Sequence, residues 1–331
     1  MAEYKGIHGT KIQNYTSDPA NPIIGQVWYN ETSQTMKVQS VTTAGAWATG
    51  GSLNTARGDL AGAGVDNTSA LAFGGEVPPQ TDATESYDGT SWTEVNNLNT
   101  ARRLLGGAGT QTSALAFGGF SSPPNAVRNE TESWNGTAWT AVNNINTART
   151  SMGRAGADNT SVLAFGGNIP GVGATVNTET WNGTSWTEVN NLNTARSGIR
   201  GSGTQTSTLG FGGKPTPSPV IAATESWNGT SWTEVNDLNT ARQQMGAAGA
   251  DNTSSLAFGG LTAIAQVANT EEWNGTSWTE QNDLNTARNE LGAAGIATSA
   301  LGFGGDAPPQ TAATEEWTGA GAPLTKTITS S

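Results

Sequence analysis

Short apolar segments alternate with glycine-rich and polar segments along most of the chain. In residues 99–142, the small-residue segment Leu104–Gly109 leads through a polar turn to the apolar segment Ala114–Phe117, which ends at Gly118-Gly119. Apolar runs of about four to eight residues between turn signals are typical of short, buried strands. Small residues suit an inner strand at which neighbouring backbones come close together, as at the axis of a propeller. The pattern predicts two strands here, the first of them innermost.

Two further strands are predicted around a tight turn in the same unit. Thr131–Trp134 and Trp139–Val142 flank Asn135-Gly136, and the Asn-Gly dipeptide favours the type I′ turn that closes a hairpin. Four antiparallel strands make one blade of a β-propeller. The hydrophobic pattern therefore indicates an all-β fold.

The same unit occurs six times. The tetrapeptide Asn-Thr-Ala-Arg recurs every 45 to 47 residues, and a double glycine ends each predicted second strand. Self-similarity at this interval indicates a repeat protein in which each unit buries its apolar face against its neighbours. We expect one six-bladed propeller of four-stranded antiparallel blades. The repeated arginines are Arg57, Arg102, Arg149, Arg196, Arg242 and Arg288.

The two ends of the repeat array complement each other. The last unit has no fourth strand after Trp317, whereas Trp47 precedes the first Asn-Thr-Ala-Arg as Trp92 precedes the second. We expect a strand at about residues 43–50 to complete the C-terminal blade, which closes the ring and leaves no exposed sheet edge at the seam. The expected organisation is an N-terminal hairpin and attachment segment at 1–40, the propeller at 41–318 and a C-terminal tail at 319–331.

The repeat resembles the kelch family of β-propellers. Kelch units have an arginine ahead of the first strand, an apolar strand ending in Gly-Gly, and two later aromatic residues, and these places are filled here by Arg102, Gly118-Gly119, Trp134 and Trp139. The resemblance covers roughly 80% of the chain and implies the propeller fold. One departure is that the first aromatic residue, usually tyrosine, is tyrosine only at Tyr87, which changes packing volume and not topology.

Composition narrows the classes of function. The formal net charge is -12, without a cluster of Lys and Arg, and such a field repels a phosphate backbone, so we expect no nucleic-acid partner. There is no cysteine, and His8 is the single histidine. The first residues lack the apolar run of a signal peptide, and no stretch approaches the length of a membrane span. We expect a soluble protein that is made in the cytoplasm and does not insert into a membrane.

The repeated charged residues are interpreted as structural. A glutamate also recurs once per unit, and catalysis needs a unique constellation rather than six equal copies. We expect the arginines to bond carbonyl groups of a neighbouring blade or an acidic residue of the repeat. These glutamates are Glu85, Glu132, Glu179, Glu225, Glu271 and Glu315.

Enzyme classes are tested against the same residues. Copper radical oxidases also use a kelch propeller, but their site needs two histidines and a cysteine-linked tyrosine, which this chain lacks. A hydrolytic triad needs a base, and His8 lies outside the repeats. We expect no catalytic residue, metal ligand or cofactor. A propeller enzyme acting on carbohydrate through paired carboxylates remains a weaker alternative.

Variation between the units is concentrated after each double glycine. These segments are rich in proline and apolar residues, and a preorganised loop surface on a rigid scaffold is where repeat proteins place recognition. Neutral variation of surface loops is the alternative interpretation. The candidate recognition residues are Val77, Pro78, Phe120, Pro123, Ile169, Pro170, Lys214, Pro215, Pro217, Leu261, Ile264 and Pro308.

The N-terminal segment lies outside the repeat and is predicted to form a hairpin. Residues 23–30 and Thr35–Val38 surround a polar turn, and the hairpin is expected to expose Trp28 and Tyr29 as candidate attachment residues. The stretch resembles a hairpin found in bacteriophage tail-fibre and other virion proteins. That resemblance implies attachment to other virion proteins through this segment, and a location in the virion.

Three functions follow from these observations. The first is a non-enzymatic phage structural protein, in the tail or a capsid appendage, whose propeller loops contact a host-surface glycan or protein. The second is a cellular kelch-type module for protein–protein interaction, and the carbohydrate-active enzyme is the third.

Overall fold

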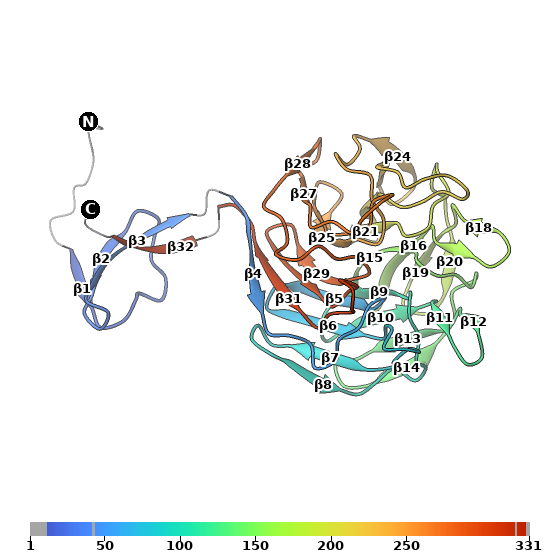
Figure 1. Cartoon of the computed structure of the whole chain (residues 1–331), viewed down its shortest axis with the longest axis horizontal. Helices are drawn as coiled ribbons and strands as arrows, with labels where there is room; N and C mark the ends of the chain where they lie inside the picture. The colour runs from blue at the N-terminus through green and yellow to red at the C-terminus, as the bar shows by residue number, and fades with distance from the viewer. Residues whose placement is uncertain (1–11, 42–43, 322, 329–331) are drawn as a thin grey trace. The chain divides into compact units, whose positions relative to one another are not determined.

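The chain divides into two units, each built from β-strands. The computed structural model describes residues 12–41, 44–321 and 323–328, so His8 lies outside the described residues. One unit comprises Met1–Gly45 with Gly319–Ser331, and the other comprises Ala46–Thr318. Every regular element in the described ranges is a strand (Figure 1), which confirms the predicted all-β class. Accordingly, no helix in this part of the chain could cross a bilayer.

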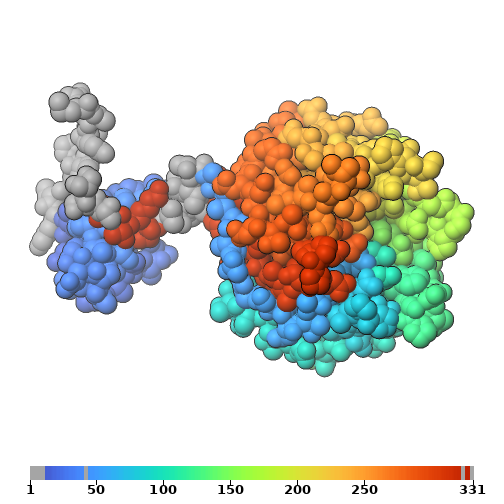
Figure 2. Space-filling view, viewed as in Figure 1, coloured from blue at the N-terminus to red at the C-terminus, as the bar shows by residue number. Residues whose placement is uncertain are grey.

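Six four-stranded antiparallel sheets make up the larger unit in the described residues. Successive sheets follow one another around the unit along the chain (Figures 1 and 2). From inner to outer strand the first three are β5 (Ala61–Asp66), β6 (Ser69–Phe73), β7 (Thr84–Tyr87) and β8 (Trp92–Val95); β9 (Gly106–Gly109), β10 (Ala114–Phe117), β13 (Thr131–Trp134) and β14 (Trp139–Val142); and β15 (Gly153–Asp158), β16 (Ser161–Phe165), β19 (Thr178–Trp181) and β20 (Trp186–Glu188).

The remaining three sheets have the same strand order. They are β21 (Arg200–Thr204), β22 (Ser207–Phe211), β23 (Thr224–Trp227) and β24 (Trp232–Val235); β25 (Gly246–Asp251), β26 (Ser254–Phe258), β27 (Thr270–Trp273) and β28 (Trp278–Glu280); and β29 (Gly292–Ile296), β30 (Ser299–Phe303), β31 (Thr314–Thr318) and β4 (Ala46–Gly50).

The sixth sheet takes its outer strand from the N-terminal side of the chain. β4 pairs antiparallel with β31, and Trp47 lies opposite Trp317. In the second sheet, by comparison, Trp139 lies opposite Trp134 between strands that are neighbours in sequence. The tryptophan pair is therefore the same whether the outer strand is local or comes from the other end of the repeat array.

The inner strands contact one another in cyclic order. β5 contacts β9, and the series continues through β15, β21 and β25 to β29, which contacts β5. Small residues permit this approach: a Cβ added at Gly107 would lie 2.5 Å from Cζ of Phe73 in the preceding sheet. A cavity of about 250 Å³ lies between all six inner strands.

A tryptophan of each outer strand joins its sheet to the one before it. The Trp139 ring lies 4.9 Å from the Phe73 ring, and its indole N–H donates to Thr84 Oγ1 at 3.1 Å. Tryptophan is suited to this place because it buries a large apolar area and still satisfies its single donor. The six donor and acceptor pairs are Trp92 with Thr314, Trp139 with Thr84, Trp186 with Thr131, Trp232 with Thr178, Trp278 with Thr224 and Trp47 with Thr270.

The smaller unit is a four-stranded sheet that uses both ends of the chain. β2 (Val27–Asn30) and β3 (Thr35–Val41) form the expected hairpin, β1 (Gln13–Tyr15) pairs parallel with β2, and β32 (Pro323–Ile328) pairs antiparallel with β3. Residues 323–328 are thus part of a sheet, although the sequence suggested only a C-terminal tail. The unit also extends past residue 40, to Gly45.

The expectation that Trp28 is exposed is wrong. Its side chain is 0% exposed, and its indole N–H donates to Asp18 Oδ1 at 3.0 Å, while Asn30 Nδ2 donates to the same oxygen at 2.7 Å. Asp18 Oδ2 pairs with Lys37 at 2.7 Å. These contacts hold the pKa of the Asp18 carboxyl well below its usual range, with the Lys37 hydrogen bond the largest cause. Trp28 is part of the core of this unit, and Tyr29 is half-buried.

Candidate functional site

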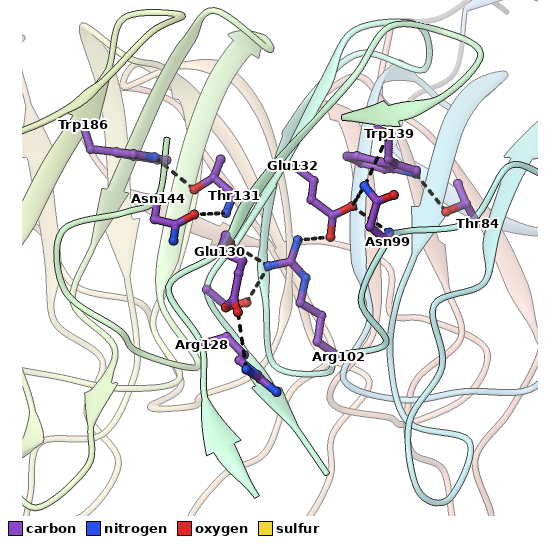
Figure 3. A network of polar contacts seen from close by, with 11 residues as sticks. Thr84, Asn99, Arg102, Arg128, Glu130, Thr131, Glu132, Trp139, Asn144 and Trp186 are labelled. Carbon is purple, nitrogen blue, oxygen red and sulfur yellow. Dashed lines mark hydrogen bonds and ion pairs between the residues drawn. The ribbon is translucent and has the colours of Figure 1, made fainter. Parts of the chain in front are cut away.

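The repeated arginines are buried within their own sheets. Arg102 is 0% exposed, and its Nη2 donates to Glu132 Oε1 at 2.9 Å (Figure 3). Its Nη1 donates to the carbonyls of Gly118 and Glu130, at 3.2 and 2.6 Å. Glu132 Oε2 accepts the backbone N–H of Asn99 at 2.7 Å. The pair therefore ties the connection before the inner strand to the third strand and to the double-glycine turn.

The other five repeats carry the same ion pair. The N–O distances in the six repeats lie between 2.5 and 3.2 Å, and every arginine side chain is inaccessible to solvent. Burial lowers the pKa of Arg149 from its ordinary value, and the charge of Glu179 opposes that shift. A ring of ligand-gripping guanidinium groups would need open faces. The six pairs instead act as internal ties, because none of these guanidinium groups reaches solvent.

The segments that follow the double glycines leave one edge of the sheets, and we call their residues the loop face. It comprises residues 76–80, 120–124, 168–171, 214–219, 261–264 and 306–309. In each repeat the first loop-face residue forms an antiparallel bridge with the residue directly after the repeated arginine, as Phe120 does with Arg103. The loops and the connections between sheets therefore lie together at the same edge.

The candidate recognition residues differ in their exposure. Ile264 is 95% exposed, and Val172, which the sequence analysis did not single out, is 71% exposed. Two loops carry short hairpins, β11 (Phe120–Ser121) with β12 (Ala126–Val127) and β17 (Asn168–Ile169) with β18 (Gly173–Ala174). Exposed candidates are Pro78, Pro123, Pro170, Lys214, Pro217, Ile264 and Pro308, and half-buried candidates are Val77, Phe120, Ile169, Pro215 and Leu261.

A cycle of six backbone hydrogen bonds lies just before the inner strands. The Asp59 N–H donates to the carbonyl of Glu290 at 2.9 Å, and each equivalent residue donates in the same way to the preceding repeat. All six have φ between 54° and 63°, and five are not glycine, although such angles disfavour side chains. The cycle therefore holds these residues in strained conformations. Its members are Asp59, Leu104, Ser151, Gly198, Gln244 and Glu290.

Two acidic members of this cycle are partly neutralised by their surroundings. Asp59 is buried, and burial raises the pKa of its carboxyl to about 8, with a further contribution from the charge of Glu290. Arg103 opposes this shift with Nη1 3.6 Å from Asp59 Oδ2, and the same guanidinium pairs with Glu76 of the loop face. Burial also raises the pKa of Glu290, to which Asp306 contributes. Charged groups thus connect the loop face with the hydrogen-bonded cycle.

Two arginines in the cavity wall were missed by the sequence analysis. Arg154 on β15 and Arg200 on β21 line the cavity between the inner strands. The equivalent positions in the other repeats hold only glycine or alanine. A charged residue inside an otherwise small-residue segment was the signal that could have identified them.

Comparison with known proteins does not assign a family. A scan against protein-family models gives no match, and a search of curated proteins finds no similar sequence. The function of this chain is therefore argued from its own geometry.

Proposed function

We propose that this chain is a non-enzymatic structural protein of a bacteriophage virion, in which a kelch-type propeller presents the loop face to a host-surface glycan or protein. One observation carries the recognition role. Six loops of unlike sequence leave the same edge of six sheets, and the same bridge anchors each of them. A constant scaffold with a variable rim is the arrangement by which repeat proteins recognise partners.

The scaffold in this proposal is a closed six-bladed ring. Support comes from the cyclic contacts of the inner strands, the six backbone hydrogen bonds from Asp59 round to Glu290, and the pairing of β4 with β31. A ring joined in this way has no free sheet edge at its seam, which limits unwanted pairing with other chains. It also fixes the loops against one another, so less conformational entropy is lost when they bind.

The virion location rests on the resemblance of the N-terminal hairpin to phage tail-fibre proteins. The smaller unit supports it in a different way than expected, since Trp28 is buried. Ile23 and Ile24 are 73% and 69% exposed and precede β2. Exposed apolar side chains of this kind are used in protein–protein contacts, so these two residues replace Trp28 as the proposed attachment residues. Other virion proteins are the partners in this part of the proposal.

The test replaces one loop and measures binding to cells. The purified chain is labelled and applied to a panel of candidate host cells and to a glycan array, with residues 214–219 replaced by a Gly-Ser linker of equal length. Thr206→Lys is the control, because Thr206 is exposed in the turn at the opposite edge of the same sheet. We expect at least about a tenfold loss of binding for the loop variant and none for the control.

Two outcomes would reject the proposal at different points. Wild-type binding by Gly-Ser variants of all six loops would exclude the loop face as the recognition surface. The absence of peptides from this chain in mass spectra of purified particles would exclude the virion location.

A further inference from the structure

The cavity between the inner strands is narrow and lined almost entirely by small residues. Its volume of about 250 Å³ is the space of roughly eight water molecules at about 30 Å³ each. The wall has little room for larger side chains, since a Cβ added at Gly201 would lie 2.3 Å from Cζ of Phe165. Any large or charged side chain in this wall is therefore an exception that needs an explanation.

Arg154 and Arg200 are the charged side chains of this wall. Arg154 pairs with Ala164, and the same register position in the other sheets holds Gly62, Gly107, Gly201, Ala247 and Ala293. Arg200 pairs with Phe211, and its position elsewhere holds Ala61, Gly106, Gly153, Gly246 and Gly292. Five of six repeats need no charge at either place, so the propeller scaffold does not require these arginines.

Both guanidinium groups keep donors free for a ligand. Arg154 Nε donates to the Gly107 carbonyl at 3.1 Å, and Arg200 donates through Nε and Nη1 to the carbonyls of Met245 and Ile199, at 2.9 and 3.2 Å. Within the described ranges, both nitrogens Nη1 and Nη2 of Arg154 and Nη2 of Arg200 have no protein acceptor. Arg200 is 8% exposed, yet neither arginine has a carboxylate within 4.0 Å in this part of the chain.

The two positive charges act on each other and stay uncompensated. Burial and the neighbouring Arg200 lower the pKa of Arg154 to about 9, which still leaves it protonated at neutral pH. Asp59 and Glu290 favour the charged form of Arg200 from a distance, but burial raises the pKa of both carboxyls. Two buried like charges without a counter-ion are costly, and an anion placed between them would remove that cost.

We propose that the cavity is a binding site for a small oxyanion, held by Arg154 and Arg200. Guanidinium forks match the geometry of carboxylate and phosphate oxygens, which makes arginine the preferred residue for such ligands. The cavity volume limits the ligand to a free anion, such as phosphate, or to the carboxylate group of a small molecule. This site is separate from the loop face and does not depend on the proposed virion role.

The experiment is isothermal titration calorimetry on the full chain with three probes: phosphate, citrate and glucuronate. Sodium chloride keeps the ionic strength constant, and the three probes separate a phosphate from a carboxylate ligand. Arg154→Ala and Arg200→Ala restore residues that other repeats carry at these positions, so both variants should fold. Arg128→Ala removes a loop-face-side arginine that pairs with Glu130 and serves as the matched control.

We expect saturable binding of at least one probe, weakened at least about tenfold in each cavity variant and unchanged in Arg128→Ala. The same probe should raise the melting temperature of the wild-type chain and not that of the double variant. Absence of saturable binding by all three probes would overturn the proposal. So would equal affinities in the wild type and the cavity variants, and if the double variant does not fold, the two single variants decide.

Discussion

Removal of the Trp47 side chain tests whether β4 is an integral part of the sixth sheet. Trp47 is 9% exposed, its ring lies 4.7 Å from Phe258 and 5.3 Å from Trp317, and its indole N–H donates to Thr270. A buried tryptophan replaced by alanine costs about 3–5 kcal/mol, which includes the cavity left behind. The hydrogen bond adds roughly 1 kcal/mol because the Thr270 hydroxyl loses its donor. We expect Trp47→Ala to cost about 4 kcal/mol.

An internal control makes this prediction specific. Trp186 has the same place in the third sheet, with its ring 5.0 Å from Phe117 and its indole N–H 3.2 Å from Thr131 Oγ1, but its strand is local in sequence. Urea denaturation followed by far-ultraviolet circular dichroism gives the loss of unfolding free energy for each variant. Similar losses for Trp47→Ala and Trp186→Ala are expected. A loss below about 1 kcal/mol for Trp47→Ala, beside a full loss for Trp186→Ala, would refute the reasoning.

Three further predictions concern buried charges and attachment. Arg149→Met leaves the Glu179 carboxylate buried without its cation and should cost about 3–5 kcal/mol in urea denaturation, while adding Glu179→Gln should recover a large part; no recovery would contradict the ion-pair account. Because the pKa of Asp59 is raised in the folded chain, the unfolding free energy should fall as pH rises from about 4 to 8, by at most about 1.4 kcal/mol per pH unit. Asp59→Asn should flatten this slope, and an unchanged slope would count against a raised pKa. Replacing Ile23 and Ile24 by serine should lower the amount of this chain in purified particles without a change in melting temperature, and undiminished incorporation would remove these residues from the attachment surface.

Local sequence signals were sufficient for the strands of the repeat. Asn135-Gly136 and Gly118-Gly119 specify turns through backbone angles that few residues adopt, and both glycines of the double-glycine turn have positive φ. The pairing of Trp47 with Trp317 was also predictable, because the repeat itself displays the missing strand. These features depend on residues close in sequence or on comparison between repeats.

Features that depend on distant segments were not predictable in the same way. Trp28 is buried because Asp18 and the surrounding strands of the smaller unit cover it, and one face of a two-strand hairpin gives no sign of this cover. The roles of Arg154 and Arg200 depend on which strands adjoin β15 and β21 around the cavity. The raised pKa of Asp59 likewise needs Glu290, which lies at the other end of the repeat array.

Competition for host cells tests the central claim most directly. Cells of the candidate host are incubated with an excess of the purified chain, and adsorption of the corresponding phage particles is then counted as free infectious particles over time. The account predicts that the wild-type chain slows adsorption and that the variant with residues 214–219 replaced, or an equivalent variant of another loop, does so less. Unchanged adsorption at a saturating concentration of the wild-type chain would contradict the claim that the loop face recognises the host.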